Sequence, residues 1–108
     1  MMFRVLLSTP DKTFFNGSAD SVVCPGPEGY FGILARHAQM VAAVGIGILK
    51  IDSEGVSRLF VVDGGVVEVT PEETAVMADL VIPATDPADA EEKLEETKAL
   101  RTVPVNIR

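Results

Sequence analysis

The sequence predicts a mainly β fold, either a small sandwich or a barrel, followed by one short C-terminal α-helix. Up to residue 82 the chain consists of short runs rich in Val, Ile and Phe, separated by closely spaced turn residues. That spacing is typical of all-β sandwiches and barrels. After Pro83 the pattern changes to charged residues with apolar ones at helical spacing. We therefore expect a β-sandwich domain over residues 1–83 and a short helix with a tail over residues 84–108.

Turn residues set the limits of the predicted strands. Pro10 ends the first strand because it has no backbone N–H to donate to a sheet. Asn16-Gly17 marks either a hairpin turn or a bulge, since both residues tolerate positive φ. Gly55 supplies the left-handed residue of a short hairpin loop, and residues 63–65 (DGG) link two further strands. The predicted strands are residues 3–9, 13–15, 20–24, 30–34, 39–44, 45–52, 57–62, 66–70 and 74–79.

A helix is predicted over residues 87–101. Asp86 can cap it, and Pro87 suits the first helical position. A helix of about four turns with so few leucines is marginal alone, so we expect it to rest lightly on the sandwich or to fray. Pro104 prevents the helix from continuing into the tail. The residues that share its narrow apolar face are Ala90, Leu94, Thr97 and Leu100.

Apolar residues occur on both faces of several predicted strands. Leu6, Val61 and Val66 each point away from the apolar residues beside them, whereas a strand with one solvated face alternates with period two. Hydrophobic residues make up 47% of the chain, although a domain of this size hides only about two thirds of its surface. We expect parts of the outer surface to be covered. The alternative is that these outward-pointing apolar residues are ordinary aliphatic side chains scattered over an exposed surface.

The charge balance excludes several classes of protein. Sixteen acidic and nine basic residues give a formal net charge of -7. A nucleic-acid binder needs a cationic face, and an anchor on anionic lipid needs clustered Lys and Arg. No apolar run is long enough to span a membrane, so we expect no direct lipid insertion. A single cysteine excludes a disulfide scaffold, and we expect a soluble protein in a reducing, intracellular compartment.

The sequence predicts no catalytic, cofactor-binding or metal site. Cys24 and His37 are the only candidates for a nucleophile and base, and no orienting acid or oxyanion hole accompanies them. Cys24 ends a Val-Val run and is predicted to be a core residue. Residues 45–47 (GIG) begin like a dinucleotide-binding loop, but Lys50 stands where its third glycine belongs. A small enzyme using Cys24 and His37 is kept as an alternative hypothesis.

The segment PGPEGYFGILARHA at residues 25–38 resembles the signature of the epsilon subunits of F-type ATP synthases. That family's pattern reads roughly Pro-Gly-x-x-Gly-x-Phe-Gly-Ile-Leu-Pro-Gly-His-Ala. Three more blocks are similar to the family in the same order: STPDK with FNG at 8–17, DGGVVEV at 63–69 and TAVMAD at 74–79. Four blocks in one register over residues 3–82 make the resemblance specific.

The resemblance implies a flattened β-sandwich of about ten short strands, followed here by one short C-terminal α-helix. It implies a non-catalytic rotor subunit of the central stalk that binds the gamma subunit and polar loops of the c-ring. The complex would hold it peripherally at the cytoplasmic face of the inner membrane, without a cofactor.

The resemblance also implies a partner-contact surface on the c-ring and gamma side. The family's signature histidine maps to His37, and its acidic position maps to Tyr30, which removes one charge. Ala35-Arg36 replaces the family's Pro-Gly and brings a cation to the loop. The expected contact residues are Glu28, Gly29, Tyr30, Arg36 and His37.

The C-terminal part departs from the family pattern. Family members carry a two-helix hairpin that can inhibit ATP hydrolysis and, in some members, bind ATP. Here one helix is predicted, the second is missing, and no Asp-x-x-Arg-Ala pattern of the ATP-binding members is present. A regulatory subunit whose C-terminal segment contacts the alpha/beta head and restrains hydrolysis is the alternative function.

Overall fold

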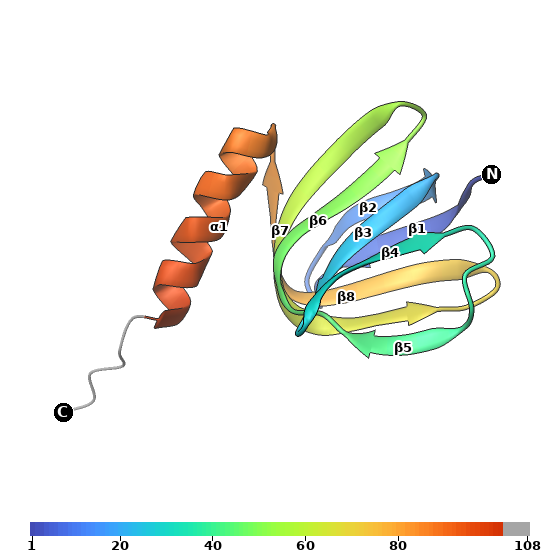
Figure 1. Cartoon of the computed structure of the whole chain (residues 1–108), viewed down its shortest axis with the longest axis horizontal. Coiled ribbons are helices and arrows are strands. Elements are labelled where there is room, and N and C mark those ends of the chain that lie inside the picture. Colours follow the sequence, from blue (N-terminus) through green and yellow to red (C-terminus); the bar gives the residue numbers. More distant parts are fainter. Residues whose placement is uncertain (103–108) are drawn as a thin grey trace.

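The computed structural model describes residues 1–102, and their side chains as far as Arg101. These residues form eight β-strands and one α-helix, which confirms the predicted fold class (Figure 1). The predicted tail with Pro104 lies outside the described residues. The elements are β1 (Phe3–Ser8), β2 (Thr13–Ala19), β3 (Ser21–Gly26), β4 (Gly29–Leu34), β5 (Met40–Ala43), β6 (Ile46–Ser53), β7 (Val56–Val69), β8 (Glu73–Ala84) and α1 (Pro87–Thr102).

Two long strands, β7 and β8, run through both layers of the sandwich. The second half of β7 pairs with β5, and the first half of β8 pairs with β1, which in turn pairs with β2. The first half of β7 pairs with β6, and β6 pairs with β3, which pairs with β4. Each layer thus contains five strand segments. The eight continuous strands therefore supply the ten short strands that the resemblance implies, because β7 and β8 are used twice.

A bend at Gly64 and Gly65 takes β7 from one layer to the other. These glycines have φ values of 76° and 120°, which L side chains rarely adopt. The pairing with β8 keeps one register across the bend, from Asp63 opposite Leu80 to Gly65 opposite Ala78. The expected break at residues 63–65 was therefore wrong: the residues on its two sides form one bent strand.

Asn16-Gly17 is also not a hairpin turn, because both residues lie inside β2 and pair with Leu6 and Val5. The irregularity in this pair of strands falls instead between Leu7 and Ser8 of β1. The chain turns toward β3 at Asp20, whose backbone N–H donates to the carbonyl of Asp52 at 2.7 Å.

One hydrophobic core lies between the layers. Val, Leu and Ile side chains from every strand except β2 and β5 are fully or almost fully buried there. Cys24 is among them, as predicted, and its side chain is inaccessible to solvent. The largest fully buried side chains in this cluster are Leu7, Ile33, Leu49, Ile51, Val5, Val22, Val62, Val67 and Val76.

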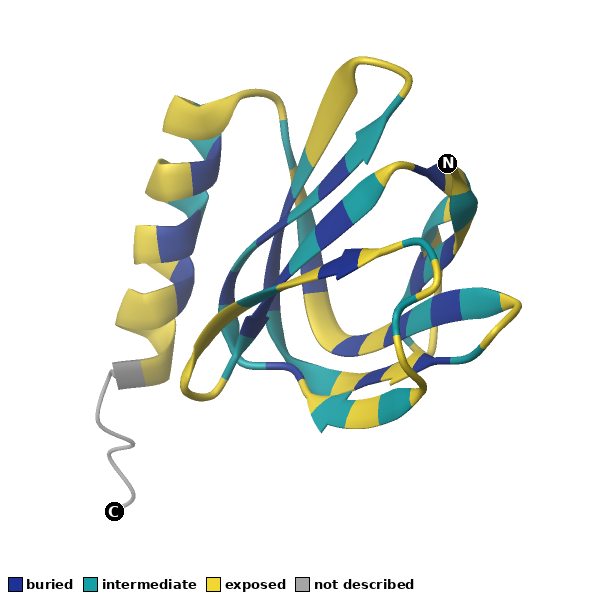
Figure 2. Ribbon diagram, turned by 45° about the vertical axis from the view of Figure 1, so that its right-hand side comes forward, coloured by how far each residue is buried: buried dark blue, intermediate teal, exposed yellow. Residues whose placement is uncertain are grey.

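Helix α1 covers the outer face of the layer that contains β6 and the first half of β7 (Figure 2). Ala90, Leu94 and Thr97 are buried on its inner side. Val61 is fully buried although its neighbours Phe60 and Val62 are the ones that face the core. The expectation that part of the outer surface is covered is therefore confirmed at Val61. Leu100 was wrongly placed in the packed face, because it is 78% exposed near the end of the helix.

Polar contacts fix the start and the end of α1. The Asp86 carboxylate accepts the Asp89 backbone N–H at 2.7 Å, which is the predicted cap. The Lys93 ammonium donates to the Pro83 carbonyl at 2.9 Å. At the far end Arg101 pairs with Asp63, beside the bend in β7. The helix therefore rests on a small apolar contact with polar contacts at both ends.

The bend predicts a sharp difference between two glycine variants. A Cβ on Gly65 would lie 2.1 Å from the Met77 carbonyl oxygen, in addition to its unfavourable φ. We expect Gly65→Ala to lower the free energy of unfolding by about 3 kcal/mol or more, measured by urea denaturation. Gly32→Ala is the control, because a Cβ there meets nothing within 4 Å. Equal midpoints for the two variants would contradict the role of the bend.

Candidate functional site

The structure places the predicted contact residues at the two ends of β4. Glu28, Gly29 and Tyr30 lie at the turn between β3 and β4, where β4 begins. Arg36 and His37 lie in the loop that follows its end at Leu34. A strand of this length spans roughly 20 Å. The five residues therefore form two groups and do not make one continuous site.

Tyr30 has a structural role that the sequence did not predict. Its hydroxyl accepts the backbone N–H of Ile48 at 3.0 Å, which joins the edge strand β4 to β6. The hydroxyl lies over Gly47, where a Cβ would come within 2.5 Å of it. The residue at the family's acidic position is thus used to hold two strands of this chain together.

The loop after β4 presents an unpaired cation in a strained conformation. Arg36 has a φ of 64°, in the left-handed region that favours glycine, and the family pattern has glycine at this position. Its guanidinium has no ion pair or hydrogen bond to any described residue. The ring atom Nδ1 of His37 lies 2.8 Å from the Ala38 carbonyl oxygen. The backbone N–H of His37 donates to the Leu34 carbonyl at 3.2 Å. The loop is held by local bonds while the cation faces solvent.

Four apolar side chains lie on the outer face of the other layer, away from α1, where Glu68 is paired opposite Val41. We call the outward-facing side chains of Val41, Ala43, Val66 and Met77 the outer patch. Ala43, Val66 and Met77 are paired across β5, β7 and β8 and so form one row. Val41, Val66 and Met77 are 69%, 40% and 53% exposed. Sequence analysis noted the outward Val66 but not its neighbours, which only the strand register brings beside it.

The hypothesis of a Cys/His enzyme finds no support in the geometry. Cys24 lies in the core and its thiol is 3.7 Å from the Pro25 carbonyl, whereas His37 lies in a surface loop. Loss of hydration on burial raises the pKa of the Cys24 thiol to about 12. Among the described residues no group of His, Cys, Asp and Glu is arranged to hold a metal ion. In the same residues no helix has the length and apolar character that a membrane span requires.

Comparison with known proteins identifies the family. The family model described as "ATP synthase, Delta/Epsilon chain, beta-sandwich domain" matches residues 2–84. The chain belongs to this family. It is 40% identical over 76 residues to the ATP synthase epsilon chain of Leptospira interrogans, covering 70% of this chain and 60% of that protein. It is 44% identical over 78 residues to ATP synthase epsilon chain 1 of Nitrobacter hamburgensis, covering 72% and 58%. The chain thus spans about 60% of the length of such relatives.

Solved structures show the same fold at lower sequence identity. A chain in the mitochondrial ATP synthase of Euglena gracilis has a TM-score of 0.72 and 23% identity, covering 97% of this chain and 69% of that one. A chain in the central stalk and c-ring structure of the Tetrahymena thermophila mitochondrial enzyme has a TM-score of 0.67 and 17% identity, covering 93% and 91%. The sandwich followed by a helix is therefore a shared architecture.

The strained loop predicts that glycine is the better residue at position 36 for stability. We expect Arg36→Gly to raise the free energy of unfolding by about 1 kcal/mol, because glycine adopts the left-handed conformation without a Cβ clash. Chemical denaturation measures the change. Arg36→Ala removes the same charge but keeps the strain, so it should give no gain. An equal gain from alanine would show that the charge, not the backbone, is the cause.

Burial of Cys24 predicts an unreactive thiol. Its raised pKa keeps the thiol protonated at pH 8, and the core excludes reagents. We expect labelling by a thiol reagent to be about a hundredfold or more slower in the native chain than in urea. A native rate equal to the unfolded rate would reopen the hypothesis of a Cys24 nucleophile.

Proposed function

We propose that this chain is a non-catalytic subunit of the rotating central stalk of an F-type ATP synthase, where it joins the gamma subunit to the c-ring. Its family membership and the exposed outer patch support this proposal. A rotor part needs surfaces that hold its neighbours and needs no reacting groups. The chain would be peripheral to the membrane, held at the cytoplasmic face through the c-ring. Residues 1–83 would couple the partners, and residues 84–108 would be accessory.

The outer patch carries the proposal, and we assign it to the gamma subunit. Exposed apolar side chains on one row of a sheet favour burial against a protein, at about 25 cal/mol for each Å² removed from water. The same row lies on β7 and β8, which also form the core, so a force applied to the patch reaches both layers. A stable contact would extend beyond these side chains to bury more than about 1,000 Å² in total.

The two groups at the ends of β4 suit two separate polar contacts. Arg36 offers a positive charge and His37 an imidazole ring, whereas Glu28 offers a carboxylate at the opposite end. Because β4 separates them, the five predicted contact residues would serve more than one partner or more than one c-ring loop.

The position of α1 favours an accessory role over the alternative of an arm that restrains hydrolysis. In this structure the helix is docked on β6, β7 and β8 and buries Val61. Its 16 residues span about 24 Å, a short reach for contact with the alpha/beta head. Deleting residues 86–108 should leave the ATPase activity of the assembled complex nearly unchanged; a marked rise would support the restraining role.

The assignment of the outer patch predicts the effect of two charges placed there. We expect Val66→Asp with Met77→Asp to reduce co-purification with the gamma subunit about tenfold or more, because an unpaired carboxylate would be buried at the contact. Leu100→Asp is the control, since it places a charge on an exposed apolar residue of the helix, outside the outer patch. A melting temperature close to that of the unchanged chain would show that the double variant is folded. Undiminished recovery of gamma would refute the assignment.

A further inference from the structure

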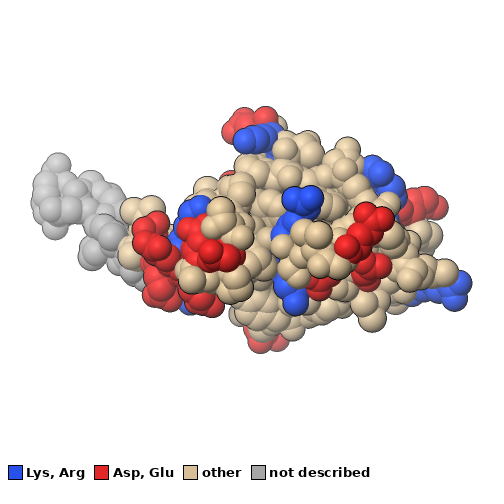
Figure 3. Space-filling model, turned by 90° about the horizontal axis from the view of Figure 1, so that it is seen from above, with Lys and Arg blue, Asp and Glu red and all other residues tan. Residues whose placement is uncertain are grey.

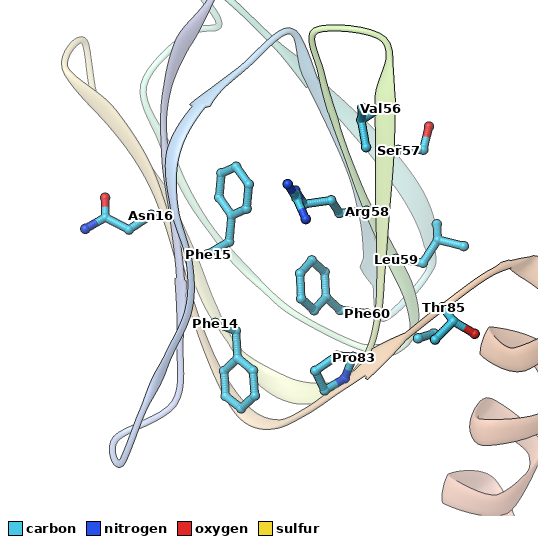
Figure 4. A pocket seen from close by; sticks show the side chains of 11 residues that line it. Phe14, Phe15, Asn16, Val56, Ser57, Arg58, Leu59, Phe60, Pro83 and Thr85 are labelled. Atoms are coloured by element: carbon cyan, nitrogen blue, oxygen red, sulfur yellow. The ribbon is translucent and has the colours of Figure 1, made fainter.

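The open side of the sandwich between β2 and the start of β7 holds a cavity of about 510 Å³. In Figure 4 the side chains of Phe15, Arg58 and Phe60 point into it from facing strands, and Pro83 closes its lower end. A second hollow adjoins it, sharing Phe15, Asn16, Val56 and Arg58 with the first. Together the two hollows form a groove along β2 from Phe14 to Ser18, which is about 17 Å of extended chain.

Both walls of this groove are strand edges without a neighbour. β2 pairs only with β1, and on its free side the Ser18 carbonyl accepts the Ser53 hydroxyl at 2.8 Å. Leu59 is the first residue of β7 paired with β8, opposite Ala84, so residues 56–58 have a partner only in β6. An unpaired edge presents backbone N–H and C=O groups to which an extended peptide can add as a further strand. The shape of the groove and its walls therefore suit an extended segment.

The charge of the groove indicates what kind of segment fits. Arg58 is the only charged residue among those that line the first cavity, and it has no ion pair or hydrogen bond within the described part of the chain. In Figure 4 the Asn16 side chain points away from the cavity, so Arg4, which binds it, lies outside the groove. Lys12 lies 5.0 Å from the centre of the Phe14 ring. Much of the negative charge lies elsewhere: Figure 3 shows acidic side chains gathered on α1. The first cavity is thus a cationic and aromatic region of an acidic protein, whereas Glu54 lines the second hollow.

We propose that this groove binds an extended peptide segment of a protein partner, with a carboxylate that pairs with Arg58. Arg58 and Phe60 are two residues apart on β7 and point to the same side (Figure 4). A strand added beside them would present every second side chain inward. The segment should therefore carry an acidic residue and an apolar residue two positions apart. The guanidinium would donate two hydrogen bonds to the carboxylate, and the apolar side chain would pack between Phe15 and Phe60.

A titration of the full 108-residue chain tests the proposal. The probe is the blocked peptide acetyl-Val-Ser-Glu-Ser-Val-amide, whose inward pattern is the same in either strand direction. We expect amide resonances of residues 13–19 and 56–60 to shift in ¹H–¹⁵N spectra. Replacing Glu by Gln in the peptide, or Arg58→Gln in the protein, should weaken binding about tenfold. Arg36→Gln removes an equally unpaired arginine elsewhere and should leave binding unchanged.

Each other outcome overturns the proposal. Absence of shifts at these two segments, or equal affinity for the Gln peptide, would show that the groove does not recognise this class of ligand. Equal shifts with sodium acetate alone would show an anion site and not a peptide site. The outer-patch variant Val66→Asp with Met77→Asp should bind the probe normally. The test of the groove is therefore independent of the test of the gamma contact.

Discussion

The structure depends on one constraint, the sharing of β7 and β8 between both layers of the sandwich. In most two-layer sandwiches each strand belongs to one sheet, and contact between the layers is made by side chains. Here the backbone itself crosses, through Gly64 and Gly65, which both have positive φ. At Gly65 a Cβ would also lie 2.1 Å from the Met77 carbonyl oxygen. The layers are thus joined by continuous hydrogen-bonded strands as well as by the core side chains between them.

The crossing also determines which surfaces remain free. Because β8 leaves the edge of its layer at Ala84 to begin α1, the first residues of β7 keep an open edge, and the groove forms there. Because the second half of β7 turns into the other layer, Val66 and Met77 lie together on a face that α1 does not cover. The covered face, the outer patch and the groove are three consequences of the same two strands.

The sequence predicted whether each segment is a strand or a helix better than it predicted the residues at which the element begins and ends. Hydrophobic periodicity and turn residues identified the strands, the cap at Asp86 and the burial of Cys24, since these follow from local chemistry. The break expected at residues 63–65 was wrong because a glycine pair can bend a strand as well as end it, and only the partner strand decides. Leu100 was misplaced because helical spacing alone does not show how far along the helix its packing against the sheet extends.

In the candidate site, too, the sequence predicted local features but not which residues lie side by side in the fold. The resemblance predicted five contact residues within one contiguous segment, but a strand through the middle of that segment places them at opposite ends. It gave no indication that Tyr30 would be engaged by the Ile48 N–H. Val41, Val66 and Met77 come from three strands far apart in sequence, so no single segment contains the outer patch. For the proposed partner contacts, the informative residues are those that strand register brings together. The sequence showed apolar residues on both faces of several strands. Only the fold shows which of these residues α1 covers and which stay exposed.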